Sequence, residues 1–147
     1  MFKYILVPTD GADFSNKAVA TAARMAQSLN ARLPVLHVRS SIDSPYHVEG
    51  GALRKLGRKV VMQEIENEER KLLDAALGIA ADGGLIAEKA FVAGYSPYDA
   101  IIRIAREQHC DLIVMASHGR GGISGLLLGS ETQKVLTHTT IPVLIVR

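Results

Sequence analysis

Short apolar runs and longer helical stretches alternate along the whole of this chain. Continuous apolar runs are typical of strands that are buried on both faces of a parallel sheet. Stretches in which apolar residues recur every three or four positions are typical of helices that pack on such a sheet. The alternation therefore predicts an α/β fold with a mainly parallel sheet and helices on both faces. The predicted strands are residues 4–7, 33–38, 87–92, 111–116 and 143–146, and the predicted helices are residues 15–30, 52–81, a helix that starts at Ser96, and 131–137.

Local signals place several boundaries of these elements. Ser96, Pro97 and Asp99 have the order expected at a helix N-terminus, with a capping side chain, a proline at the first position and an acid in the first turn. Asn30 follows the last apolar residue of the first helical stretch and is a common helix stop. Residues 39–51 are rich in Ser, Asp, Pro and Gly and are expected to form a loop.

The composition bounds the size, the compartment and the partners of the chain. Its 147 residues are expected to form one domain, residues 1–147. Seventeen Lys and Arg against fifteen Asp and Glu give a net charge of +2, too balanced for a main partner that is nucleic acid or an anionic membrane. The single cysteine, Cys110, excludes an internal disulfide and suits a reducing compartment. Because the sequence has no membrane-length apolar stretch and no secretory leader, we expect a cytoplasmic protein.

A glycine-rich segment follows the apolar run 111–116. It contains Gly119 and leads, after nine residues, to Gly129 at the start of a predicted helix. Glycines let a backbone approach a ligand closely, and the free N–H groups at a helix start favour an anion. Ser130 and Thr132 would add hydroxyl donors at the same helix start. The segment therefore has the chemistry of a phosphate-binding site, although the Gly-x-x-x-x-Gly-Lys-Ser pattern of P-loop enzymes is absent.

Several motifs together resemble the universal stress protein family. The signature of that family is Gly-x-x-Gly, nine residues, and then Gly-Ser or Gly-Thr. Gly119 and the pair Gly129-Ser130 match this signature with the right spacing, whereas Ala116 stands at the position of the first glycine. The resemblance includes Ile-Leu-Val-Pro-Thr-Asp-Gly at positions 5–11 and Ile-Pro-Val-Leu-Ile-Val near the end, so it extends along the whole chain.

This resemblance implies a single-domain, five-stranded parallel sheet with strand order 3-2-1-4-5. In open parallel sheets, ligands bind at the carboxyl ends of the strands where the strand order changes direction, here between strands one and four. Asp10 follows strand one and Met115 lies at the end of strand four, so two distant stretches are expected to converge on one crevice. The ligand that the family implies is ATP, with Mg²⁺ arriving on its phosphates. The expected binding residues are Pro8, Thr9, Asp10, Val38, Met115, Ala116, Gly119, Arg120, Gly129, Ser130, Glu131 and Thr132.

The resemblance also assigns roles along the expected ATP site. Asp10 corresponds to the acid at the adenine end, and Val38 to its apolar neighbour. Met115 and Ala116 fall where the family lines the ribose and its phosphate link. The residues that fall at the phosphates are Gly119, Gly129, Ser130, Glu131 and Thr132. The chemistry agrees, because a carboxylate only accepts hydrogen bonds and suits an amino or hydroxyl donor rather than a phosphate.

Several of these residues also have a structural interpretation. Asp10 could cap the turn after the first strand, Ser130 could cap its own helix, and Arg120 could be a solvated side chain. Glu131 would point outward from the first turn of its helix and interact with the helix dipole. For Ala116, a methyl group costs affinity if this position needs a positive φ or a tight approach of the backbone to the ligand, and is harmless if its φ is ordinary.

Besides an adenine-nucleotide-dependent enzyme of the same broad fold, two functions follow from these observations. The first is an ATP-binding stress protein that responds to nucleotide; the alternative is a dimeric protein-interaction module that does not bind nucleotide. No residue pattern predicts a catalytic site, and the family implies at most slow ATP hydrolysis or self-phosphorylation on Ser130 or Thr132. The five histidines show no spacing with acids or cysteine that is typical of a metal site.

The last apolar run, residues 143–146, predicts a homodimer. In the strand order of the family it is an edge strand, and only Arg147 follows it. An apolar edge exposes unpaired backbone groups and invites pairing, and a two-fold axis would set two copies of the strand antiparallel. Pro142 lacks an N–H group and would limit the pairing at one end. The sequence identifies no other protein partner.

Overall fold

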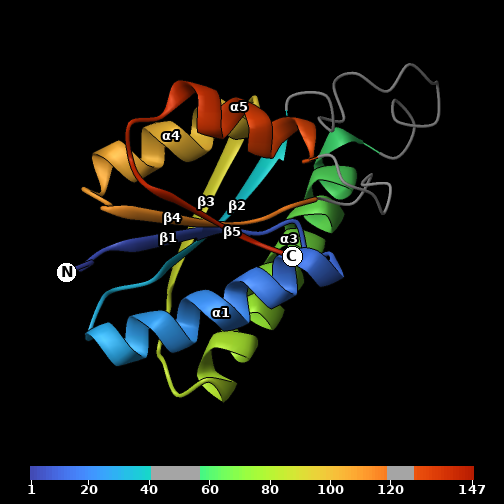
Figure 1. Cartoon of the computed structure of the whole chain (residues 1–147). Coiled ribbons are helices and arrows are strands. Elements are labelled where there is room, and N and C mark those ends of the chain that lie inside the picture. The colour runs from blue at the N-terminus through green and yellow to red at the C-terminus, as the bar shows by residue number, and fades with distance from the viewer. Residues whose placement is uncertain (41–56, 119–127) are drawn as a thin grey trace.

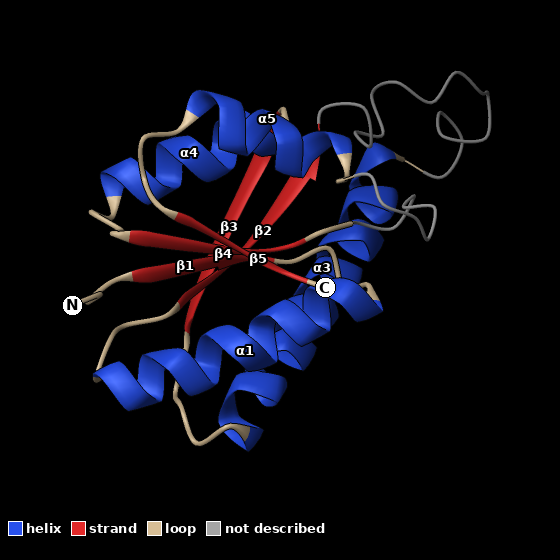
Figure 2. Ribbon diagram, in the orientation of Figure 1, coloured by secondary structure: helices blue, strands red, loops and turns tan. Residues whose placement is uncertain are grey.

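The computed structural model of this protein describes residues 1–40, 57–118 and 128–147 (Figure 1). The elements in chain order are β1 (Ile5–Pro8), α1 (Asp13–Leu29), β2 (Pro34–Ser40), α3 (Arg58–Asp82), β3 (Glu88–Tyr95), α4 (Pro97–Glu107), β4 (Leu112–Ala116), α5 (Ser130–His138) and β5 (Val143–Val146). The strands pair in parallel in the order β3-β2-β1-β4-β5, which confirms the predicted fold class and strand order. Figure 2 shows the sheet between two layers of helices, with α1 and α3 on one face and α4 and α5 on the other.

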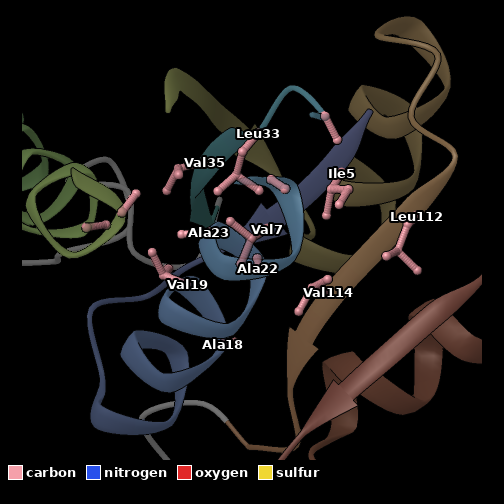
Figure 3. Close-up of a cluster of buried hydrophobic side chains, with 14 of the residues drawn as sticks. Ile5, Val7, Ala18, Val19, Ala22, Ala23, Leu33, Val35, Leu112 and Val114 are labelled. Carbon is pink, nitrogen blue, oxygen red and sulfur yellow. The ribbon is translucent and has the colours of Figure 1, made fainter. Parts of the chain in front are cut away.

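The core on the α1 face packs small helix residues against larger strand residues. Ala18, Ala22 and Ala23 of α1 are completely buried, and Figure 3 shows them beside Val7 of β1 and Val114 of β4. A single methyl group on each of these helix positions lets the helix axis lie close to the sheet without a void. This close packing fixes α1 relative to the carboxyl end of β1.

The opposite face is filled by larger side chains. Ile101 and Ile104 of α4 and Val135 of α5 pack against Leu6 and Leu36 of the sheet. Burying each such side chain contributes about 1.5–3 kcal/mol. The central strands β1 and β4 are therefore apolar on both faces, which explains why their sequence shows continuous apolar runs.

The β2 and β3 strands extend further than the sequence predicts. Residues 39 and 40, expected to belong to a loop, are part of β2, and β3 continues to Tyr95. The pairing shifts register between Arg39 and Ser40, because Gly94 is inserted between their partners Ala93 and Tyr95 with a φ of +84°. A β-bulge of this kind interrupts the apolar pattern from which a strand is predicted. The other part of the expected loop and the start of the expected helix 52–81 lie in residues 41–56, outside the described residues.

Two predicted local features can be compared directly with the structure. Asn30 is the C-cap of α1 in the left-handed conformation, with a φ of 51°, as its position at the helix end predicts. Cys110 is only 6% exposed. Burial and the nearby carboxylates of Asp111 and Glu88 raise the pKa of the Cys110 thiol to about 11, so it stays protonated at neutral pH. Over the described ranges, none of the helices combines the length and the apolar character that a membrane span requires.

We predict opposite effects of alanine at two glycines that both have open space around an added Cβ. Gly94 has a positive φ, whereas Gly78 lies inside α3. Gly94→Ala should lower the free energy of unfolding by about 1–2 kcal/mol through backbone strain. Gly78→Ala should raise it by about 0.5–1 kcal/mol, because alanine is the better helix former. Urea denaturation of both variants measures the difference; equal effects would contradict the assignment of strain to Gly94.

Candidate functional site

A pocket of about 480 Å³ opens at the carboxyl ends of the central strands. These strands meet where the order of the sheet changes direction, since β1 lies between β2 and β4. Ten of the twelve sequence-predicted residues line this one pocket: Pro8, Thr9, Asp10, Val38, Met115, Ala116, Gly129, Ser130, Glu131 and Thr132. The remaining two, Gly119 and Arg120, lie outside the described residues. The pocket therefore joins segments that are more than a hundred positions apart in the sequence.

Seven further lining residues were not predicted from the sequence: Ser15, Leu36, His37, Ser40, Pro97, Ile101 and His118. His118 follows β4, where its Nδ1 lies 3.0 Å from the Ser117 hydroxyl and its ring 5.8 Å from the ring of Phe14. Leu36 and Ile101 belong to the α4-side core, and their apolar pattern carried no information about a pocket. The sequence does single out Ser15, because it is a polar residue on the buried stripe of α1.

The turn after β1 is shaped by the side chains of Thr9 and Asp10. Thr9 Oγ1 accepts a hydrogen bond from the Gly11 amide at 3.1 Å. Asp10 Oδ1 accepts from the Ala12 amide at 3.0 Å and from the Ser15 hydroxyl at 2.6 Å. The structural interpretation of Asp10 is therefore correct as far as the turn is concerned. The same residue also lines the pocket, so the two interpretations are compatible.

His37 of β2 forms part of the pocket wall. Its Nδ1 lies 3.0 Å from the carbonyl oxygen of Thr9, and because a carbonyl can only accept, Nδ1 carries the hydrogen. Its Nε2 faces Glu69 Oε1 of α3 at 4.0 Å, and Arg39 Nε lies 3.5 Å from the same oxygen. Burial raises the pKa of Glu69, while Arg39 and His37 oppose that shift. This nearly buried polar cluster connects α3 to the backbone at the end of β1.

Ala116 has an ordinary extended backbone. It is the last residue of β4, pairs in register with Val146, and is not among the residues with positive φ. Its side chain packs with the α1-side core. The backbone of Ala116 therefore does not require glycine, while the effect of its methyl group on a ligand in the pocket that it lines stays a prediction.

Thr132 uses its hydroxyl inside the protein. Its side chain is 4% exposed, and Oγ1 donates to the carbonyl oxygen of Ala116 at 3.0 Å. The expectation that Thr132 adds a donor for a ligand is therefore wrong for the state described, since a hydroxyl has only one hydrogen to donate. This bond instead ties α5 to the end of β4.

The N-terminus of α5 faces the pocket. Its N-cap is Gly129, whose amide donates to the Ser117 carbonyl at 2.7 Å, and Ser130 is the exposed first residue of the helix. The interpretation of Ser130 as the N-cap is thus wrong by one position. The amides of residues 130–132 have no acceptor within the helix, because the first turn lacks a preceding one. They make the positive end of the helix dipole.

Glu131 does not point outward as expected. Its Oε2 accepts a hydrogen bond from the Tyr98 amide in the first turn of α4 at 2.8 Å, and its Oε1 lies 2.9 Å from Lys134 Nζ. Ser96, the predicted side-chain cap of α4, makes no capping hydrogen bond. A carboxylate from α5 therefore takes over part of the capping of α4 and remains at the edge of the pocket.

Comparison with known proteins agrees with this architecture. The model of the universal stress protein family matches residues 1–147. The chain belongs to the universal stress protein family. It is 34% identical over 154 residues to the universal stress protein YxiE of Bacillus subtilis (strain 168), covering 100% of both chains.

Two solved universal stress proteins have similar folds. The universal stress protein UspA from Lactobacillus plantarum matches with a TM-score of 0.77 and 26% identity, covering 99% of this chain and 98% of that chain. A universal stress protein in complex with cAMP matches with a TM-score of 0.70 and 26% identity, covering 99% of this chain and 97% of the other.

We predict that Thr132→Val destabilises this universal stress protein. Valine fills the same volume but removes the donor to the buried Ala116 carbonyl, which should lower the free energy of unfolding by about 1–3 kcal/mol. Thr137→Val is the matched control in the same helix, because the Thr137 hydroxyl is exposed and bonds back to the Gln133 carbonyl. Urea denaturation should find a change of about 0.5 kcal/mol or less for the control. Equal losses in both variants would contradict the role given to Thr132.

Proposed function

We propose that this universal stress protein binds ATP, with Mg²⁺ on the phosphates, and acts as a nucleotide-responsive protein of stress adaptation. The observation that carries the proposal is the polarity of the pocket. A carboxylate lies at the end of β1, a helix N-terminus lies after β4, and apolar side chains lie between them. A molecule with a donor at one end, a flat apolar part and an anionic end is complementary to that arrangement.

The adenosine part of ATP suits the β1 and β2 side of the pocket. Val38, Leu36 and Ile101 provide an apolar wall for a base. Asp10 provides an acceptor for an amino or hydroxyl group of the nucleoside. Pockets for such ligands are commonly apolar with a few placed polar groups, as here.

The phosphates suit the N-terminus of α5. Amides at the start of a helix and the helix dipole attract anions. The Tyr98 amide and Lys134 Nζ hold the Glu131 carboxylate near this point. A divalent cation on the phosphates would reduce the repulsion between them and this carboxylate. The relative at 26% identity that was solved with cAMP adds support for an adenine nucleotide.

The first experiment is mass analysis of small molecules released when freshly purified protein is denatured. ATP at a near-stoichiometric level supports the proposal. Repeated absence of nucleotide, together with no binding of added ATP and Mg²⁺ in calorimetric titration, would instead favour the alternative of a dimeric interaction module. Ala116, at the position of the first signature glycine, is the sequence feature that favours this alternative, and its ordinary φ weakens that argument because alanine causes no backbone strain there.

We predict that Gly129→Val weakens ATP binding by about tenfold or more. Gly129 has φ −58° and ψ 149°, which valine tolerates, so the fold should persist while the branched side chain obstructs the amides at the start of α5. Loss of one charge-assisted hydrogen bond is enough for about a tenfold effect. Calorimetric titration of the folded variant measures it.

Ala116→Gly is the control for this prediction. Because Ala116 has an ordinary backbone, glycine should leave the affinity unchanged and lower the free energy of unfolding by about 0.4–1 kcal/mol through the unfolded chain. Unchanged affinity in Gly129→Val would remove Gly129 from the site, and tighter binding by Ala116→Gly would mean that the methyl group obstructs ATP.

We also propose that the protein forms a homodimer through β5. This strand is at an edge of the sheet and its side chains are half-buried. The carbonyl of Pro142 accepts from Ile113 of β4, and that of Val146 accepts from Ser117 just after β4. Since a parallel ladder alternates, the backbone groups of Val143 and Ile145 face the open edge. A two-fold axis that pairs two such edges would satisfy these groups in both copies.

We predict that Ile145→Pro converts the dimer into a monomer, whereas Ile145→Ala does not. Both changes remove the isoleucine side chain, but only proline also removes the N–H group of residue 145. That N–H group points to the open edge and makes no hydrogen bond to β4. Sedimentation at micromolar protein concentration distinguishes the two states. A wild type that is already monomeric, or a proline variant that remains dimeric and folded, would show that this interface is wrong.

A further inference from the structure

Ser15 is an exception on the buried face of α1. The other buried residues of this helix are Ala18, Val19, Ala22, Ala23 and Ala26, all of them apolar. Ser15 is only 4% exposed, yet it carries a hydroxyl group. A buried hydroxyl is costly unless it is hydrogen-bonded. Here it donates to Asp10 Oδ1 at 2.6 Å, a short bond typical of a hydroxyl on a charged carboxylate.

This bond fixes the orientation of the Asp10 carboxylate. Oδ1 receives two donors from different directions, the Ser15 hydroxyl and the Ala12 amide. The amide belongs to the turn itself, but Ser15 belongs to a helix that is packed against the sheet. Because Asp10 and Ser15 both line the pocket, the contact lies at its surface rather than in the core.

We propose that Ser15 is a positioning residue that holds the Asp10 carboxylate toward an amino or hydroxyl donor of the bound nucleoside. The inference rests on the proposed function, in which Asp10 accepts a hydrogen bond from the nucleoside of ATP. A carboxylate that is already fixed loses less conformational freedom when the ligand binds, so its hydrogen bond contributes more to affinity. Ser15 thus acts on binding through Asp10.

The test is Ser15→Ala, measured for both affinity and stability. Affinity for ATP should fall about tenfold in calorimetric titration, the effect of losing one hydrogen bond to a charged group. The melting temperature should change little, because Oδ1 keeps the hydrogen bond from the Ala12 amide, water in the pocket can replace the hydroxyl, and alanine is the better helix former. A purely structural role predicts the opposite, a lower melting temperature with unchanged affinity.

Ser28→Ala is the matched control in the same helix. Ser28 is exposed, and its hydroxyl bonds back to the Arg24 carbonyl. This variant should change neither the ATP affinity nor the melting temperature by more than a small amount. A tenfold loss of affinity in Ser28→Ala would mean that the effect of Ser15→Ala comes from a general change in α1.

A double-mutant cycle with Asp10→Ala tests whether Ser15 acts through Asp10. Once the carboxylate is absent, Ser15→Ala should cause no further loss of affinity. Additive losses would overturn the inference, as would unchanged affinity of Ser15→Ala in a wild type that binds ATP; the proposed function would then still stand. A wild type that binds no nucleotide would overturn both.

Discussion

The burial of β1 on both faces is the constraint on which the rest of this structure depends. Ile5, Leu6 and Val7 are completely buried, with α1 packed on one side and α4 on the other. The strand is held at its start as well, because Asp111 accepts hydrogen bonds from the amides of residues 3 and 4. With both faces and the start of the strand fixed, the chain can turn only at its carboxyl end. That end brings the residues after β1 to the point where the sheet changes direction.

The fold could be predicted because it depends on patterns that are local in sequence. The apolar run 143–146 predicted both ends of β5 correctly, and Asn30 ends α1, as expected of an asparagine at a helix C-terminus. The strand order came from the resemblance to the family and agrees with the structure. The convergence of β1 and β4 then followed from topology, which is why so many of the expected residues lie around one pocket.

The details of the pocket could not be predicted, because they depend on contacts between distant residues. Nothing near Ser96 in the sequence indicates that the carboxylate of Glu131 meets the first turn of α4. Likewise, the sequence does not show that the Thr132 hydroxyl is used by Ala116. In each case a polar side chain in the first turn of α5 bonds to a partner on another element. Which partner is within reach depends on how the two elements pack against each other.

The bulge in β3 has a consequence for the size that an assembly of this protein can reach. A sheet with two regular edges can add copies at both, and such growth has no natural end. Here the β3 edge is irregular: Gly94 shifts its register, and the exposed Glu88 and Lys89 place opposite charges at its beginning. A second strand cannot follow that edge without the same interruption. The two edges are therefore unequal, and the proposed pairing at the regular one would give a closed particle rather than a fibre.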